Sequence, residues 1–221
     1  MPVSFSNIQS DTLVTLLGGG ELNPRDLAES LSIAPKLVAA DGGADSALAL
    51  GRRPSAVIGD LDSLSDRARR ELPSETLIHV PEQESTDFQK ALSRIAAPGV
   101  VALGLTGGRS DHELAAWHVL LAEPVPRCVV VAAEDLVFLC PAELHLDLPV
   151  GTRVSLFPMA PVTGRSEGLT WPIDGIGFAP GKRIGTSNET CRARLHLTMD
   201  TAAMLVILPK AHLGAVCSAL F

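Results

Sequence analysis

The first 132 residues repeat one pattern, in which a short apolar run is followed by a turn and then by a segment of helical character. The runs are four to six residues long, and most of them lead directly into Gly, Pro or Asp. Short continuous apolar runs are typical of strands buried on both faces, and their alternation with helices predicts a parallel sheet. The predicted strands are Thr12–Leu17, Lys36–Ala40, Ser55–Ile58, Thr76–Val80, Val100–Leu105 and Cys128–Ala132.

The pattern changes after about Cys140. Long helical periods are absent from the sequence there, and short strands are divided by Pro and Gly turns, which predicts a small antiparallel β domain. We therefore predict an α/β fold: a parallel-sheet, Rossmann-like domain over residues 1–140, followed by an antiparallel β-sandwich domain over residues 141–221. The predicted strands of the second domain are Leu144–Leu148, Arg153–Phe157, Arg192–Thr198 and Met204–Leu208.

Composition limits the possible partners. The 221 residues are 46% hydrophobic, which is enough for a packed core, and they carry a formal net charge of −7 without a basic run. This charge disfavours binding to nucleic acid or to an anionic membrane, and the absence of Tyr argues against stacking on single-stranded nucleic acid. An anionic substrate would therefore have to be bound by a local positive feature, such as a metal ion, a helix N-terminus or a few Arg and Lys residues at the site.

Location and metal type can also be predicted. Residues 1–6 lack the features of a signal peptide, and no apolar run has the length of a membrane span, so we expect a cytoplasmic protein. The four cysteines form no C-x-x-C pair, which is typical of free thiols in a reducing compartment. The six histidines are scattered without an H-x-x-x-H motif, which argues against a zinc site.

Carboxylates recur where predicted strands end. Asp60 and Asp62 follow the strand Ser55–Ile58, Asp41 follows an earlier strand, and Asp87 and Asp111 follow later ones. Carboxyl ends of parallel strands share one edge of a sheet, so these side chains can converge. A pair such as Asp60 and Asp62 can hold Mg²⁺ together with a polyphosphate. The alternative for the pair is a strand-to-helix loop with an Asx turn and a capping Ser63.

The other charged candidates also have structural alternatives. Thr86 with Gln89, and Ser110 with Glu113, fit capping boxes, so Asp87 and Asp111 are favourable at helix starts through the dipole alone. Arg109 can bind phosphate oxygens in a bidentate manner, or it can be a solvated loop residue. Lys90 is either a similar ligand or a surface helix residue, and we slightly favour the surface.

Six short motifs give the chain its resemblance to a known family, the thiamine pyrophosphokinases. Each is modest alone, but together they stand in the family's order from about Leu13 to Leu208. The motifs are Asp41-Gly42-Gly43-Ala44, Ile58-Gly59-Asp60-Leu61-Asp62-Ser63, Ser85-Thr86-Asp87-Phe88-Gln89-Lys90-Ala91-Leu92, Gly107-Gly108-Arg109-Ser110-Asp111-His112, Gly168-Leu169-Thr170-Trp171-Pro172 and Gly185-Thr186-Ser187-Asn188-Glu189.

The resemblance implies a reaction and its residues. The pyrophosphoryl group of ATP would pass to the hydroxyethyl oxygen of thiamine and release AMP, in a homodimer with active sites between subunits. The metal ligands for Mg²⁺ would be Asp60, Asp62 and Asp87, and these three with Arg109 and Asp111 would form the catalytic set. Contacts to ATP and its phosphates would come from Asp41, Gly42, Gly43, Gln83, Thr86, Lys90, Gly107, Gly108 and His112.

Thiamine would be bound by the β domain. The resemblance implies that Trp171 lies against the cationic thiamine ring, for which a cation–π interaction gives a physical reason. It also implies that Thr186, Ser187 and Asn188 offer hydrogen bonds to the pyrimidine. Without the resemblance, Trp171 would be interpreted as a core residue and the Thr186–Asn188 stretch as a turn.

The chain departs from the family pattern at three positions. Asp45 stands where the family often has Asn, Ser110 where an aromatic residue is common, and Ala116 where the family has Asn. These differences concern substrate contacts, because the metal-type carboxylates are all present. Two alternative functions remain open: a pyrophosphokinase for another heterocyclic alcohol such as a hydroxymethylpterin, and a catalytically silent protein that binds thiamine or a nucleotide.

Overall fold

The computed structural model describes residues 8–122 and 125–221, and it divides the chain into two compact units, Met1–Ala133 and Glu134–Phe221. The predicted boundary lay after residue 140. The structure divides the chain earlier because strand β9 (Asp135–Leu139) pairs antiparallel with strand β15 (Met204–Pro209) of the second unit. The prediction about a signal peptide rests on residues 1–6, which lie outside the described ranges. Within those ranges, every helix is too short or too polar to cross a membrane.

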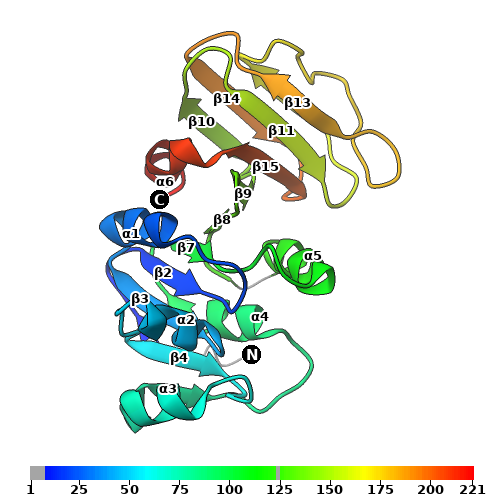
Figure 1. Cartoon of the computed structure of the whole chain (residues 1–221). Coiled ribbons are helices and arrows are strands. Elements are labelled where there is room, and N and C mark those ends of the chain that lie inside the picture. The colour runs from blue at the N-terminus through cyan, green and yellow to red at the C-terminus, as the bar shows by residue number, and fades with distance from the viewer. Residues whose placement is uncertain (1–7, 123–124) are drawn as a thin grey trace. The chain divides into compact units, whose positions relative to one another are not determined.

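The first unit contains the predicted parallel sheet (Figure 1). Its strand order is β8-β7-β2-β3-β4-β5, and all neighbouring pairs run parallel. The sheet therefore confirms the predicted α/β fold. The strands are β2 (Val14–Leu17), β3 (Lys36–Ala40), β4 (Ala56–Gly59), β5 (Leu77–His79), β7 (Val100–Leu103) and β8 (Cys128–Val131). A separate parallel pair joins β1 (Ile8–Gln9) to β6 (Ile95–Ala96).

Helices follow these strands as predicted. Asn23 accepts a hydrogen bond from the Arg25 N–H at the start of the first helix, and Thr86 caps the fourth by accepting from the Gln89 N–H. The helices are α1 (Pro24–Ile33), α2 (Gly43–Ala49), α3 (Asp66–Glu71), α4 (Asp87–Leu92) and α5 (Ser110–Val119), and a 3₁₀ turn, η1, covers Ser74–Thr76.

Two caps that the sequence suggested, Ser63 in the alternative interpretation of its loop and Ser110 in a capping box, are not formed. Ser65 caps α3 instead of Ser63, because the Ser63 N–H donates to Asp41 and its hydroxyl to Asp62. Ser110 is the first residue of α5, and Arg109 occupies the cap position without a side-chain capping bond. For Ser63, polar contacts with two carboxylates of the predicted site replace the capping pattern.

Most strands of the sheet in the first unit are buried on both faces, although the edge strand β5 is not. All four residues of β2, β4, β7 and β8 are buried, as continuous apolar runs predict. A cluster that includes Ala39, Leu48, Val57 and Leu61 packs helices α2 and α3 against this sheet. This core holds the strand ends in place, so side chains that follow them sit on a rigid edge.

The second unit is antiparallel, with strand orders β13-β11-β15-β9 and β10-β14-β12 in two sheets. Four of these strands were predicted: β10 (Glu143–Asp147), β11 (Arg153–Pro158), β14 (Arg194–Met199) and β15. β9, β12 (Gly164–Glu167), β13 (Gly185–Glu189), a 3₁₀ turn η2 (Lys210–His212) and the closing helix α6 (Leu213–Leu220) were missed. The sequences of β12 and β13 are almost wholly polar, so they carry no apolar signal.

Candidate active site

The ends of β3 and β4 bring together carboxylates that are far apart in the sequence. Asp41 follows β3, Asp60 follows β4 and Asp87 opens α4. One carboxylate oxygen from each lies within 4.8 Å of the others. A Cβ at Gly59 would lie 2.9 Å from the Asp41 Cβ and 3.2 Å from Asp87 Oδ1, so the absence of a side chain there lets the carboxylates approach. We refer to Asp41, Asp60 and Asp87 as the carboxylate cluster.

Lys90 neutralises part of this cluster. Its ammonium group lies 3.2 Å from Asp60 Oδ2 and 3.2 Å from Asp87 Oδ1, and the side chain is only 2% exposed. The slight preference for a surface position was therefore wrong, because Lys90 lies one turn after Asp87 on the buried side of α4. One ammonium group offsets less negative charge than three carboxylates carry, which leaves the cluster suited to a further cation.

Asp41 is the buried member of the cluster. It is 2% exposed, and its Oδ1 lacks a hydrogen-bond partner among the described residues, while Oδ2 accepts from the Ser63 N–H at 3.2 Å. Burial, followed by the nearby carboxylates, raises the pKa of Asp41 to about 6. An unpartnered, buried oxygen atom among converging carboxylates fits a hard cation such as Mg²⁺.

Asp60 has the opposite electrostatic environment. Gln83 Nε2 donates to its Oδ2 at 2.9 Å, and this bond, with smaller contributions from the Asp62 N–H and Lys90, lowers the pKa of Asp60 to about 2. Asp60 is therefore ionised at neutral pH. Gln83, predicted to contact the nucleotide, serves in this structure to orient a cluster carboxylate.

Asp62 is not part of the group within 4.8 Å. The residue between the two aspartates, Leu61, has a φ of +65° and turns its side chain into the apolar core. Asp62 is left exposed, its N–H donates to Asp60 Oδ1 at 3.3 Å, and its Oδ1 accepts from the Ser63 hydroxyl. The structure thus brings Asp41, Asp60 and Asp87 together, whereas the predicted metal set was Asp60, Asp62 and Asp87.

Arg109 and Asp111 pair with each other at the start of α5. Arg109 Nη2 lies 2.6 Å from Asp111 Oδ2 and Nε lies 3.1 Å from Oδ1, with the two side chains 71% and 64% exposed. The Asp111 carboxylate also accepts from the His112 N–H at 3.0 Å. This bidentate pair lowers the pKa of Asp111. Arg109 is therefore accessible to an anion, but binding one competes with Asp111.

The four glycines that were predicted to contact the phosphates of ATP differ in how much open space lies around them. A Cβ at Gly43 would lie 2.1 Å from the Leu17 carbonyl oxygen, so packing requires glycine there, whereas Gly107 has a φ of +80°, a backbone conformation that favours glycine. Gly108 faces open space, and a Cβ at Gly42 would make only ordinary contacts, so backbone there is approachable. Thr86 is used as the α4 cap.

Two of the three departures from the family pattern, Asp45 and Ala116, have local explanations. Asp45 points to the start of α3, where it accepts from the Ser65 N–H at 3.0 Å and from the Ser65 hydroxyl. Its extra charge is thus used to anchor a helix N-terminus. Ala116 is 2% exposed and packs in the core, so this position offers no polar group to a ligand.

In the β unit, Trp171 is 58% exposed, which excludes the core alternative. The buried Asn188 side chain holds the backbone of Trp171 through two hydrogen bonds. Asn188 Nδ2 donates to the Trp171 carbonyl at 2.7 Å, and Oδ1 accepts from the Trp171 N–H at 3.2 Å. Asn188 therefore positions Trp171, while Thr186 and Ser187 remain exposed. Ser187 has a φ of +60°, and its N–H donates to Ser155 Oγ at 3.0 Å, so this stretch is an irregular strand rather than a turn.

The sequence matches known proteins over most of its length. Residues 27–131 match the family model described as thiamin pyrophosphokinase, catalytic domain. Thiamine pyrophosphokinase 1 of Oryza sativa subsp. japonica is 28% identical over 168 residues, covering 67% of this chain and 64% of that protein. Thiamine pyrophosphokinase 3 of the same organism is 30% identical over 155 residues, covering 62% and 58%. The chain thus matches less than two thirds of the length of either relative.

Solved structures share the fold. A Lactobacillus plantarum protein has a TM-score of 0.75 at 26% identity, covering 90% of this chain and 98% of that one. Thiamin pyrophosphokinase from Candida albicans has a TM-score of 0.75 at 16% identity, covering 95% and 94%, which supports the two-domain fold alone. The family match covers the strand ends that carry the carboxylate cluster. The chain is thus similar to thiamine pyrophosphokinases in the sequence of its α/β unit and in its fold.

Proposed function

We propose that this protein is a thiamine pyrophosphokinase, which transfers the pyrophosphoryl group of ATP to the hydroxyethyl oxygen of thiamine and produces thiamine diphosphate and AMP. The carboxylate cluster carries the proposal, because it gives a chain similar to this family a charged site at the strand ends of its α/β unit. ATP is the co-substrate, and the proposed cofactor is Mg²⁺.

Mg²⁺ would be held by Asp60 and Asp87, with Asp41 as a third carboxylate of the cluster and Asp62 available from the adjacent loop. Bound with the triphosphate, the ion supplies charge neutralisation for attack at phosphorus. Lys90 holds Asp60 and Asp87 in one arrangement through its two ion pairs. A carboxylate of the cluster is available to accept the proton of the attacking hydroxyl group.

The remaining predicted contacts complete the proposal. Arg109 would exchange Asp111 for phosphate oxygens, and the open backbone at Gly42 and Gly108 would approach the nucleotide. Gln83, Thr86 and His112 would also lie close to the nucleotide. Gln83 would act there through its hydrogen bond to Asp60.

Thiamine would lie against the exposed face of Trp171 and bond to Thr186 and Ser187. A cationic thiazolium over an indole face is favourable, and Trp171 is presented for that contact by Asn188. We also propose a homodimer with active sites between subunits, as the family resemblance implies.

A product assay tests the reaction. Purified protein is incubated with ATP, Mg²⁺ and thiamine, and the nucleotides and thiamine species are separated. Equal amounts of AMP and thiamine diphosphate are expected. ADP with thiamine monophosphate would mean transfer at the γ-phosphorus and would contradict the proposal. Thiamine binding without product would indicate a binding protein, and product from a hydroxymethylpterin in place of thiamine would indicate the other pyrophosphokinase.

Variants test whether the cluster is responsible. Asp60→Asn is expected to lower turnover by at least about 100-fold, because the metal site loses a charged ligand. The matched control is Asp66→Asn, which removes an exposed carboxylate from the first turn of α3 in the same unit. Equal turnover in the two variants would overturn the assignment of the cluster, even if the wild-type protein made thiamine diphosphate.

A further inference from the structure

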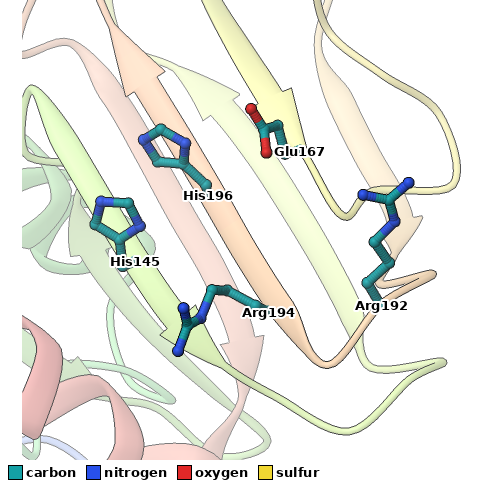
Figure 2. A pocket seen from close by; sticks show the side chains of 5 residues that line it. All are labelled: His145, Glu167, Arg192, Arg194 and His196. Atoms are coloured by element: carbon teal, nitrogen blue, oxygen red, sulfur yellow. The ribbon is translucent and has the colours of Figure 1, made fainter.

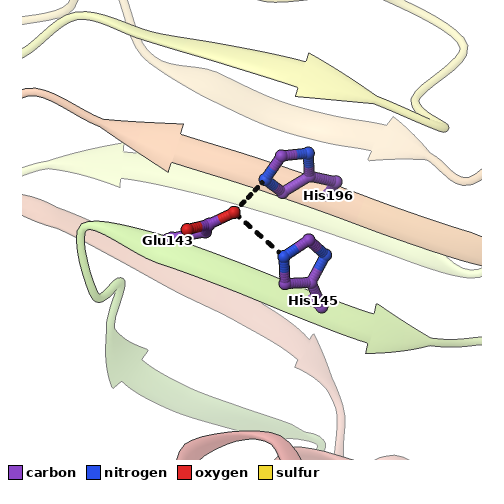
Figure 3. Close-up of side chains that lie close together, drawn as sticks. All are labelled: Glu143, His145 and His196. Carbon is purple, nitrogen blue, oxygen red and sulfur yellow. Dashed lines mark hydrogen bonds and ion pairs between the residues drawn. The ribbon is translucent and has the colours of Figure 1, made fainter.

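The second unit carries a group of polar side chains that the proposed reaction does not use. Strands β10 and β14 alternate between buried and more exposed residues, with Leu144, Leu146, Leu195 and Leu197 buried on one side. The other side presents Glu143, His145 and His196 (Figure 3). We refer to these three residues as the His–Glu group.

The strand pairing places the His–Glu group together. His145 and His196 are direct cross-strand partners in the antiparallel β10–β14 ladder, and Glu143 is two residues from His145 on the same face. Side chains directly opposite each other in such a ladder have Cβ atoms only about 5 Å apart. The four buried leucines anchor both strands from behind, so the three side chains extend from a rigid surface.

The donor atoms of the group converge on one point. Glu143 Oε1 lies 3.1 Å from His145 Nε2 and 3.1 Å from His196 Nε2, and one ligand atom from each residue lies within 4.8 Å of the others. The two imidazole rings are stacked with centroids 4.2 Å apart. Hydrogen bonds from His145 and then His196 lower the pKa of Glu143, so its carboxylate is ionised.

These distances are close to those around a metal ion. Ligands about 2.1 Å from a tetrahedral ion lie about 3.4 Å from each other, and the two N···O distances of the group are only slightly shorter. Coordination requires each imidazole to carry its proton on Nδ1, so that Nε2 no longer donates to Glu143, and both rings to turn so that the Nε2 lone pairs face the ion. The His145 side chain is 57% exposed, which leaves room for that rotation.

A pocket adjoins the group and leaves space for further ligands. Its volume is about 280 Å³, and its lining includes His145 and His196 together with Glu167, Arg192 and Arg194 (Figure 2). Glu167 on β12 is the cross-strand partner of His196 on the side opposite His145. Water molecules in this pocket can complete the coordination of an ion held by the His–Glu group.

We propose that Glu143, His145 and His196 form a binding site for a divalent transition metal ion of the Zn²⁺ class, with water in the remaining positions. Two imidazoles and one carboxylate suit Zn²⁺, whereas Mg²⁺ prefers oxygen ligands, so this site differs in chemistry from the carboxylate cluster. The sequence argued against zinc because it contains no H-x-x-x-H. That motif cannot detect this site, because its ligands come from two paired strands and not from one helix.

Metal titration tests the proposal. The full chain is stripped of metal and then titrated with Co²⁺, whose visible absorption reports tetrahedral nitrogen and oxygen ligands, and with Zn²⁺ in competition against a chromophoric chelator. Excess Mg²⁺ is present throughout to occupy the carboxylate cluster. One equivalent is expected to bind to the wild-type protein. His145→Gln, His196→Gln and Glu143→Gln are each expected to raise the Kd by about tenfold or more.

Two control variants remove other groups that could bind the same metals. His118→Gln removes an exposed histidine of α5, and Cys191→Ser removes the exposed thiol, and neither is expected to change the Kd. Circular dichroism checks that every variant is folded. In the wild-type protein, imidazole NMR resonances of His145 and His196 are expected to shift on addition of Zn²⁺ while that of His118 does not. Zn²⁺ affinity that is unchanged in His145→Gln and His196→Gln, or shifts confined to other histidines, would overturn the proposal.

Discussion

The ammonium group of Lys90 lies 3.2 Å from Asp60 Oδ2, although the two residues are 30 positions apart in the chain. A second ion pair joins the same ammonium group to Asp87, one helical turn earlier. Lys90 is thus a buried cation that holds two carboxylates of different elements in one place. An ion pair of this kind fixes geometry, and removing its cation leaves uncompensated negative charge.

Lys90→Met is expected to lower both turnover and stability. Without the ammonium group the carboxylates repel one another, so we expect turnover to fall by at least about tenfold and the free energy of unfolding to fall by about 2 kcal/mol. Arg70→Met, which removes an exposed cation of α3, is the control and should change neither quantity. Normal turnover in Lys90→Met would show that the ion pairs are dispensable for the site.

The pH dependence of stability should reveal Asp41. Its pKa is raised from 3.8 to about 6, so the folded state retains a proton that the unfolded state loses between about pH 4 and pH 6. The free energy of unfolding should therefore fall as pH rises through this window, by on the order of 3 kcal/mol in metal-free buffer. Asp41→Asn removes that titration, and Asn tolerates the φ of +40° at this position. Denaturant unfolding at several pH values should show the variant gaining stability relative to the wild type only above about pH 4. A difference independent of pH would contradict this account.

Asp62→Asn tests whether the exposed Asp62 contributes to the metal site in addition to the carboxylate cluster. Because the side chain is exposed, the free energy of unfolding should change by less than about 0.5 kcal/mol. If Asp62 joins Asp60 in holding Mg²⁺ when ATP is bound, turnover should fall by about 100-fold or more, and initial rates at saturating substrate measure this. Near-normal turnover would remove Asp62 from the metal site and leave Asp41 as the third carboxylate.

Gly59→Ala should disrupt the carboxylate cluster by steric conflict. The new methyl group would lie 2.9 Å from the Asp41 Cβ, so the carboxylates must move apart. We expect a loss of about 1–3 kcal/mol in the free energy of unfolding and a higher Mg²⁺ concentration for half-maximal rate. Gly177→Ala adds a methyl group in open space and should leave both measurements unchanged. An unaltered Mg²⁺ dependence in Gly59→Ala would show that the convergence of the carboxylates is not needed.

Trp171→Ala should weaken thiamine binding without affecting ATP. The indole is 58% exposed, so its removal changes stability little, while the loss of a cation–π contact should raise the KM for thiamine by about tenfold. Leu114→Ala removes an exposed apolar side chain from the other unit and is the control. An unchanged KM for thiamine would remove Trp171 from the substrate site.

Asn188→Ala provides a companion test of the same surface. Loss of its two bonds to the Trp171 backbone should raise the KM for thiamine without changing the KM for ATP, because the indole is then less well held. Asn188→Asp keeps the acceptor for the Trp171 N–H and should have a smaller effect. If Asn188→Ala binds thiamine normally while Trp171→Ala does not, the indole keeps its position without Asn188.

The sequence determined the α/β architecture of the first unit, because strands buried on both faces need continuous apolar runs and these alternate with helical segments. It also determined that Asp41 and Asp60 lie at strand ends, since each follows such a run, and that Asp87 lies at the start of the helix after the next strand. The polar strands β12 and β13 could not be predicted, because their pairing depends on neighbours that are distant in the chain.

Which of these carboxylates meet depends on the three-dimensional packing of the unit. The positive φ of Leu61 directs that side chain into the core and leaves Asp62 exposed outside the cluster, and the packing of α4 buries Lys90 between Asp60 and Asp87. Likewise, antiparallel pairing brings Glu143 within hydrogen-bond distance of His196, 53 residues away. Such contacts depend on the register between strands and on backbone torsion, which local residue patterns do not encode.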